Sequence, residues 1–392
     1  MVATSTQLLS EDMLTRFAER APVYDKENRF FQEDFDELTK IGFLKMPIPK
    51  ELGGLGMNLS EWGQEVRRLA KAAPATAVAV NMHLYWMGVA ADLWKAGDKS
   101  CEWMLREGAA GEVYAAGHAE SGNDLPLLLS TAKAERVDGG YKITGRKMFG
   151  SLSPVWTRFG FHAMDTADPN NPKIVHGFLP RDAVGYRIDA TWDSLGMRAS
   201  MSNDTVMDGA VCPDKYIARV VAAGPAGVDL FILGVFANAL VGLANVYFGT
   251  ALRARDIAIE GAHKRTSLGL TRSMAYHPHM QYNAAEMDML IESVTALIDR
   301  VAADWSNGVD HGMAWPAKIV GAKHTAVESA KRIVDIAMEM SGGSGFYKAS
   351  ELEHLYRDVR GGGFHPANSA LTHEIVGKTA LGVGLDEMPR WG

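Results

Sequence analysis

Residues 139–149 read GGYKITGRKMF, and the hydrophobic period of the chain changes at this stretch. The Gly-Gly pair favours a turn, and the short β-rich run after it favours a strand. Similar short runs follow with turn residues between them: IVHGFLP at 174–180, GYRIDA at 185–190 and NDTVMDGAVC at 203–212. This spacing predicts a small antiparallel β domain over residues 113–220.

The sequence on both sides of this β segment has helical periodicity. Before it, apolar residues recur at helical spacing in residues 31–41, 62–73 and 75–94. After it, residues 287–301 carry an amphipathic stripe at i, i+3, i+4 and i+7. Long helices with few breakers indicate a helical bundle.

Three domains are therefore expected. They are an N-terminal helical domain (residues 1–112), the central β domain and a C-terminal four-helix bundle (residues 221–392). The β domain is expected to be barrel-like. No strand followed by G-x-G-x-x-G opens a βαβ unit, which argues against a Rossmann fold.

Composition excludes several classes of protein. The 392 residues are 47% apolar, which is ample for a large core, and the net charge of −7 lacks the basic footprint of a nucleic-acid binder. No membrane span or secretory signal is expected, so a cytoplasmic location is predicted. His277, His279 and His311 have no further ligand at useful spacing, and no metal is expected.

Five landmarks then identify a family by resemblance. They are IPKELGGLG (48–56), GGYKITGRKMF, SLGMRASMSNDTVMDGAVCPDKYI (194–217), HKRTSLG (263–269) and MSGGSGFYKASELEHLYRDVR (340–360). In this order they resemble the acyl-CoA dehydrogenase superfamily along nearly the whole chain. The resemblance implies a homotetramer with a flavin at the junction of the β domain and the bundle. It also implies that neighbouring subunits contribute to each flavin site.

The resemblance also implies which residues contact the flavin. Arg265 stands where the family places a phosphate-contacting arginine, and Phe149 stands where it carries a tryptophan against the flavin. The other expected cofactor contacts are Ser151, Gly342, Gly343 and Asn368. A surface charge at a helix end is the alternative for Arg265, and ordinary core packing is the alternative for Phe149.

The flavin itself is expected to be FAD or FMN. Family positions that contact the adenine of FAD correspond to Leu268 and Pro278 here, and a glutamine of the late motif is Glu339. Weaker adenine anchoring suits FMN, or a flavin that exchanges with a separate reductase.

The dehydrogenase pattern is broken at the catalytic base. The family's glutamate, which abstracts a proton α to a thioester carbonyl, corresponds in one branch to Pro366. A second branch carries it early in the first bundle helix, where Asp229 is the only acid here. An acyl-CoA dehydrogenase with a displaced base, Asp229 or Glu339, remains one alternative. A non-catalytic flavoprotein paralogue is another.

Another branch uses the same fold as the oxygenase component of two-component flavin monooxygenases. Members resembling dibenzothiophene monooxygenase take reduced flavin from a separate reductase, and carry a histidine shortly after an Arg-x-x-Arg pattern. Here Arg357 and Arg360 precede His365. This branch is the favoured reading, with a small aromatic, heteroaromatic or amine substrate.

Two histidines are candidate catalytic residues. His365 follows the Gly361–Gly363 turn, which is expected to bring the backbone close to the flavin, and a group with a pKa near 7 can supply or hold a proton there. A locally bonded loop histidine is the alternative. His83 lies among aromatic residues and would face the same cavity in this fold, but a satisfied core histidine beside aromatic packing is the favoured interpretation.

Overall fold

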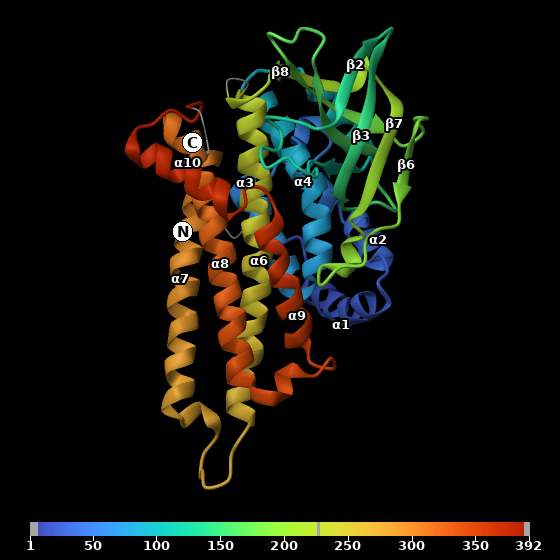
Figure 1. Ribbon diagram of the computed structural model, residues 1–392. Coiled ribbons are helices and arrows are strands. Elements are labelled where there is room, and N and C mark those ends of the chain that lie inside the picture. The colour runs from blue at the N-terminus through green and yellow to red at the C-terminus, as the bar shows by residue number, and fades with distance from the viewer. Residues whose placement is uncertain (1–6, 226–227, 388–392) are drawn as a thin grey trace.

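The computed structural model describes residues 7–225 and 228–387, and it has helices on both sides of a central sheet (Figure 1). The five N-terminal helices are α1 (Glu11–Glu27), α2 (Gln32–Lys40), α3 (Leu59–Ala72), α4 (Pro74–Lys95) and α5 (Glu102–Ala110). A capping box formed by Asn58 and Glu61 begins α3. Nearly every residue of α4 is buried, so this helix forms the centre of the N-terminal part.

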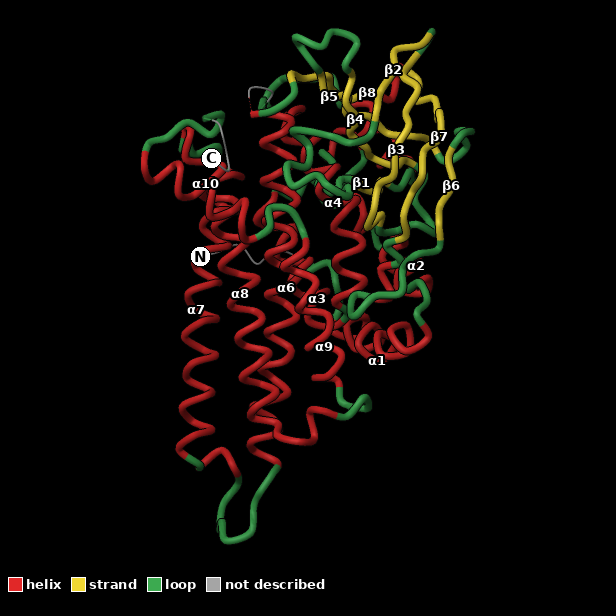
Figure 2. The backbone as a smooth tube through the Cα atoms, in the orientation of Figure 1, coloured by secondary structure: helices red, strands yellow, loops and turns green. Residues whose placement is uncertain are grey.

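The central part is one eight-stranded sheet, drawn in yellow in Figure 2. Its strands are β1 (Tyr114–Gly117), β2 (Lys133–Val137), β3 (Gly140–Gly150), β4 (Arg158–Asp165), β5 (Lys173–Pro180), β6 (Tyr186–Asp189), β7 (Asn203–Pro213) and β8 (Ile217–Ala222). The order is β6-β7-β3-β2-β4-β5-β8, with β1 paired to β4. Two pairs, β1 with β4 and β2 with β4, are parallel, so the prediction of a purely antiparallel sheet is wrong. The long connections between these strands permit parallel pairing, which a hairpin turn does not.

The C-terminal part is a bundle of three long and two short helices. They are α6 (Leu230–Lys264), α7 (Pro278–Ser306), α8 (Trp315–Ser341), α9 (Glu351–Arg360) and α10 (Ser369–Leu381). The three long helices run side by side in Figure 1, and α9 and α10 both pack on α8. The helical majority with a central sheet confirms the predicted fold class.

Helix α6 is the central element of the bundle. It packs on α3, α4, α7, α8 and α9. By length and composition it is apolar enough to cross a membrane, yet 78% of its most apolar window is buried inside the protein. Burial on all sides by neighbouring helices therefore accounts for its composition.

The glycine run before His365 packs closely against two helices of the bundle, and its expected approach to a flavin stays a prediction. Residues Gly361–Phe364 form a 3-10 turn that lies tightly against α6 and α8. A Cβ at Gly361 would meet Tyr247 Oη at 2.9 Å, and a Cβ at Gly362 would meet Val327 Cγ1 at 2.7 Å. Close packing against two helices therefore requires glycine here.

Candidate active site

A cavity of about 350 Å³ lies where the three parts of the chain meet. Its walls come from α4, from the ends of β1 and β3, from the segment between β6 and β7, from α6 and from the turn after α9. Most of the lining is apolar, and the size is typical of sites that hold small molecules. The polar lining groups are therefore few, and each one restricts what can bind.

His365 lies in this cavity wall beside Tyr247 of α6. Its Nε2 is 2.8 Å from Tyr247 Oη, which joins the turn after α9 to the centre of the bundle. Burial, together with the nearby Lys323 ammonium, lowers the pKa of His365 to about 3. The expected pKa near 7 is therefore wrong, and the imidazole is neutral at physiological pH.

A buried lysine holds the turn that carries His365. The Nζ of Lys323, on α8, donates to the backbone carbonyls of Gly362, His365 and Ala367 at 3.0, 3.1 and 3.1 Å. Burial lowers the pKa of Lys323 to about 8, so the ammonium form still predominates at neutral pH. This one side chain thus fixes the backbone on both sides of Pro366, another lining residue.

Replacing Lys323 with methionine is expected to lower any turnover that depends on His365 by up to about 10²-fold, because small displacements of a positioned group have effects of this size. Steady-state kinetics measure the change. Lys331→Met is the matched control, since Lys331 lies on the same helix but pairs with Glu328 at 2.7 Å. Equal turnover in Lys323→Met and Lys331→Met would contradict the role of Lys323.

The wall across from α6 contains two of the predicted flavin contacts, Phe149 and Ser151. Phe149 is 48% exposed within the chain, and its ring lies edge-on to Trp192, 5.9 Å between centroids. Ser151 Oγ is 2.8 Å from Ser202 Oγ. Aromatic faces with a few hydroxyl groups in an apolar cavity fit a flavin ring.

None of the cavity-lining residues that the structure describes is an aspartate or a glutamate. Asp229 caps the N-terminus of α6 through Ile232 N and pairs with Arg219. Glu339 is half-exposed on α8, with its Oε1 2.8 Å from His279 Nε2. Neither alternative base therefore reaches the cavity.

His83, the second candidate catalytic histidine, is not among the lining residues of the cavity. Its Nε2 is 3.0 Å from the Leu44 carbonyl, and its Nδ1 accepts from Tyr114 N at 3.1 Å. Both ring nitrogens are thus bound to backbone, and burial lowers the pKa of His83 to about 4. The structure gives this residue the place of a satisfied core histidine.

The remaining predicted contacts lie elsewhere. Arg265, just after α6, donates to the carbonyls of Gly261, Met340 and Ser341, and so caps the end of α8 beside Gly342. Gly343 follows in the same turn. This group is about 27 Å along α6 from Tyr247, so one chain does not bring it to the cavity. Asn368 caps α10 through Leu371 N.

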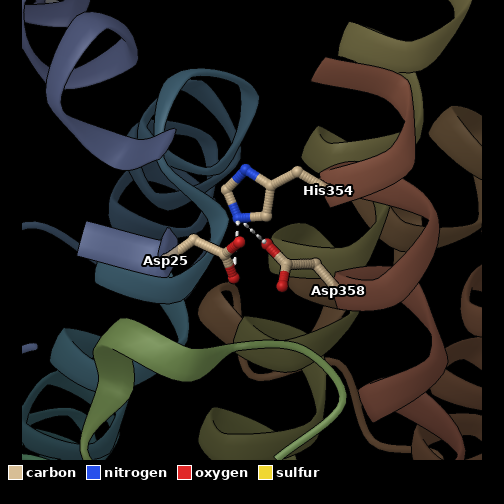
Figure 3. Close-up of side chains that lie close together, drawn as sticks. All are labelled: Asp25, His354 and Asp358. Atoms are coloured by element: carbon tan, nitrogen blue, oxygen red, sulfur yellow. Dashed lines mark ion pairs between the residues drawn. The ribbon is translucent and has the colours of Figure 1, made fainter. Parts of the chain in front are cut away.

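A buried ionic cluster fixes another cavity wall (Figure 3). His354 Nε2 is 3.0 Å from Asp358 Oδ2 and 3.7 Å from Asp25 Oδ1, which links α9 to α1. Asp358 also accepts from the backbone N of Met197, a lining residue. Arg357 is bound to both oxygens of Asp25, at 3.0 and 2.6 Å.

The charges of His354, Asp358 and Asp25 indicate that this cluster is a set of ion pairs and not a metal site. Burial alone would lower the pKa of His354, but the Asp358 and Asp25 carboxylates outweigh it and raise the pKa to about 9. A protonated imidazole has no lone pair for a metal ion. The Asp25 carboxylate is already neutralised by Arg357.

This raised pKa predicts a pH dependence of stability. A histidine whose folded pKa exceeds its unfolded value stabilises fully below about pH 6.5, and the contribution is lost as pH rises through about 9. The free energy of unfolding should therefore fall between pH 7 and 9, by on the order of 2–3 kcal/mol. Denaturant unfolding at several pH values measures the slope. An unchanged slope in His354→Gln would contradict this assignment.

Sequence reasoning missed several polar residues of the cavity, among them Tyr247, Tyr85 and His118. Each sits in an apolar context, in which a helical tyrosine or a strand-end histidine resembles core. Tyr247 is 118 positions from its partner His365. No local pattern indicates such a pairing.

Comparisons with known proteins agree with this architecture. Residues 4–100 match the acyl-CoA dehydrogenase N-terminal domain, and residues 227–380 match the C-terminal domain of the same family. The L-evernosamine nitrososynthase of Micromonospora sp. is 28% identical over 386 residues, covering 95% of this chain and 89% of the relative. The short-chain specific acyl-CoA dehydrogenase of Bos taurus mitochondria is 25% identical, covering 86% and 79%.

A solved relative, KijD3 in complex with FMN and dTDP-3-amino-2,3,6-trideoxy-4-keto-3-methyl-D-glucose, superposes with a TM-score of 0.83. It is 26% identical and is covered over 93% of its length, with 96% of this chain aligned. The two family models match the helical parts on either side of the sheet, and KijD3 superposes along nearly the whole chain. The chain belongs to the acyl-CoA dehydrogenase superfamily.

Proposed function

We propose that this protein is the oxygenase component of a two-component flavin monooxygenase, and that it oxygenates the nitrogen of an amine. The absence of any carboxylate among the described lining residues carries the proposal. Dehydrogenation of an acyl thioester requires a base at the α carbon, and a carboxylate is the family's choice. His365 and Tyr247 stand in the wall instead.

Reduced flavin, when bound, supplies the electrons that activate O₂ for oxygen transfer. The chain's own residues exclude water, orient the amine and hold protons. A neutral His365 bonded to Tyr247 leaves one donor and one acceptor free in either tautomer. The pair can thus accept from an amine N–H while donating to an oxygen atom.

An amine is the preferred substrate class because of the relatives. Two of them are named as nitrososynthases that act on amino sugars, at 28% identity. Making a nitroso compound from an amine adds oxygen to nitrogen. The apolar lining also favours the neutral amine, which is the nucleophilic form, over the ammonium ion.

FMN from a separate reductase is the proposed cofactor. Leu268 is fully exposed in one chain, which gives an adenine no packing there. Arg265 donates three of its five N–H groups to backbone carbonyls. In the proposed homotetramer, the Arg265 end of a neighbouring chain supplies any remaining contact to the flavin phosphate.

A single set of assays tests this function. Purified protein is mixed with chemically reduced FMN, air and a dTDP-linked 3-amino-4-ketosugar, and mass spectrometry follows the product. The expected product is the amino sugar with oxygen added to its amine nitrogen, detected by its change in mass. Anaerobic bleaching of tightly bound oxidised FAD by butyryl-CoA would overturn the proposal in favour of a dehydrogenase.

Cofactor preference has its own measurement. Calorimetric titration should give FMN binding at least as tight as FAD. Tenfold tighter binding of FAD, about 1.4 kcal/mol, would refute the argument from the missing adenine contacts.

A further inference from the structure

A second group of polar residues lines the cavity besides His365 and Tyr247. Tyr85 of α4 and His118 after β1 both line the cavity, and Tyr85 Oη is 2.9 Å from His118 Nε2. Behind them, His118 Nδ1 is 3.3 Å from Nδ1 of His162 on β4. Four polar atoms thus form one chain that ends at the cavity.

The inner end of this chain sets where the protons lie. The backbone N–H of Leu127 points at His162 Nε2, 3.4 Å away, and an amide nitrogen can only donate. Burial strongly lowers the pKa of both His162 and His118, to about 3 for His118, so each ring is neutral and carries one proton. His162 Nε2 is therefore an acceptor, and its proton is on Nδ1.

The remaining protons follow in order. His162 Nδ1 donates to His118 Nδ1, so the proton of His118 is on Nε2 and is donated to Tyr85 Oη. Tyr85 makes no other hydrogen bond within the described residues. Its own proton therefore points to whatever fills the cavity.

Neighbouring groups do not reverse this order. Glu120 Oε2 is 3.7 Å from His162 Nε2, beyond hydrogen-bond distance, and Glu120 is bound by Lys147 at 2.6 Å. A hydrogen bond to the Leu129 carbonyl also acts on the His162 ring, and it is the smallest of the influences that raise or lower the pKa of His162. If His162 instead carried its proton on Nε2 and donated it to the Leu129 carbonyl, the chain would run the other way and Tyr85 would accept from the ligand. The experiments below separate the two directions.

We propose that Tyr85 is a dedicated hydrogen-bond donor that recognises an acceptor atom of the bound molecule, with His118 and His162 as positioning residues. The inference rests on the proposed function for its occupant. Such an acceptor is a carbonyl oxygen or an unprotonated ring nitrogen, supplied by the flavin edge or by a keto group of the substrate. The free proton of Tyr85 favours an acceptor atom over an N–H group at this place, which directs the amine to the His365 side.

Binding measurements test the donor. Tyr85→Phe removes only the hydroxyl and should weaken one of two probes about tenfold, FMN by fluorescence titration or the dTDP-linked 3-amino-4-ketosugar by calorimetry. The affected probe identifies the source of the acceptor. Tyr24→Phe is the matched control, because Tyr24 is a buried tyrosine whose hydroxyl binds Asp34 outside the cavity.

A double-mutant cycle tests the positioning role. His118→Phe should weaken the same probe, and the pair of changes together should be no worse than Tyr85→Phe alone, because His118 acts through Tyr85. Unchanged affinity for both probes in Tyr85→Phe, or losses that simply add, would overturn the inference. A wild-type protein that binds neither probe would instead overturn the proposed function.

Neutron diffraction can locate the protons on His118 and His162, and so gives the direction of the hydrogen bonds without a turnover assay. Deuterium is expected on His118 Nε2 and His162 Nδ1. Deuterium on His118 Nδ1 would make Tyr85 an acceptor and would overturn the inference even if all variants fold poorly.

Discussion

Replacing His365 with alanine should lower product formation by about 10²–10⁴-fold, the usual range for a positioned acid–base group. Folding and flavin binding should stay nearly intact, because among the described residues the side chain bonds only to Tyr247, and the backbone of its turn is held by Lys323. The lost turnovers should appear as H₂O₂, since water then competes for the activated oxygen. Product and peroxide yields per reduced FMN measure both effects.

Companion variants separate proton handling from local structure. His365→Asn can keep a hydrogen bond to Tyr247 but cannot take up a proton, so it should be as inactive as alanine. Tyr247→Phe should show a smaller loss, because the imidazole remains. Normal coupling of oxygen to product in His365→Ala, with an intact assembly, would return His365 to the role of a loop histidine.

Replacing Asp358 with alanine should lower the free energy of unfolding by about 3–5 kcal/mol, the usual result of removing one partner of a buried ion pair. Asp358 is fully buried, and its loss leaves His354 short of a counter-charge and Met197 N without an acceptor. The cavity wall at Met197 loses its anchor to α9 at the same time. Denaturant unfolding at fixed protein concentration measures the change.

Glu353→Gln is the matched control for this prediction. Glu353 pairs with Arg357 on the same helix, but it is partly exposed, and such pairs contribute about 0–1 kcal/mol. A loss below 1 kcal/mol in Asp358→Ala, similar to that in Glu353→Gln, would show that the cluster does not hold α1 and α9 together.

Sequence periodicity predicted amphipathic helices and strands because one face of each such element is buried. The stripe at 287–301 became part of α7, and GGYKITGRKMF became β3. Parallel pairing of β1 with β4 was not predictable, since register between distant segments leaves no local pattern.

Predictions for the site likewise depended on whether a residue's role is visible in the local sequence or arises from contacts with distant segments. Phe149, Ser151 and His365, which the family resemblance singled out, all line the cavity. His83 could not be excluded in advance, because its partners are backbone groups of Leu44 and Tyr114 that only tertiary packing supplies. The direction of the hydrogen bonds among Tyr85, His118 and His162 depends on three segments that are distant in sequence. It could not be predicted from the sequence alone.

The cavity's construction from three parts of the chain links ligand affinity to folding. Its walls include Tyr85 from the N-terminal helices, Phe149 from the sheet and Tyr247 from the bundle, so the site exists only where all three are docked. A ligand that binds only this docked state stabilises every part at once, by RT ln(1 + [L]/Kd). Occupancy of the cavity therefore stabilises the docked arrangement of all three parts. A rise in the unfolding temperature should report binding even of ligands that are never turned over.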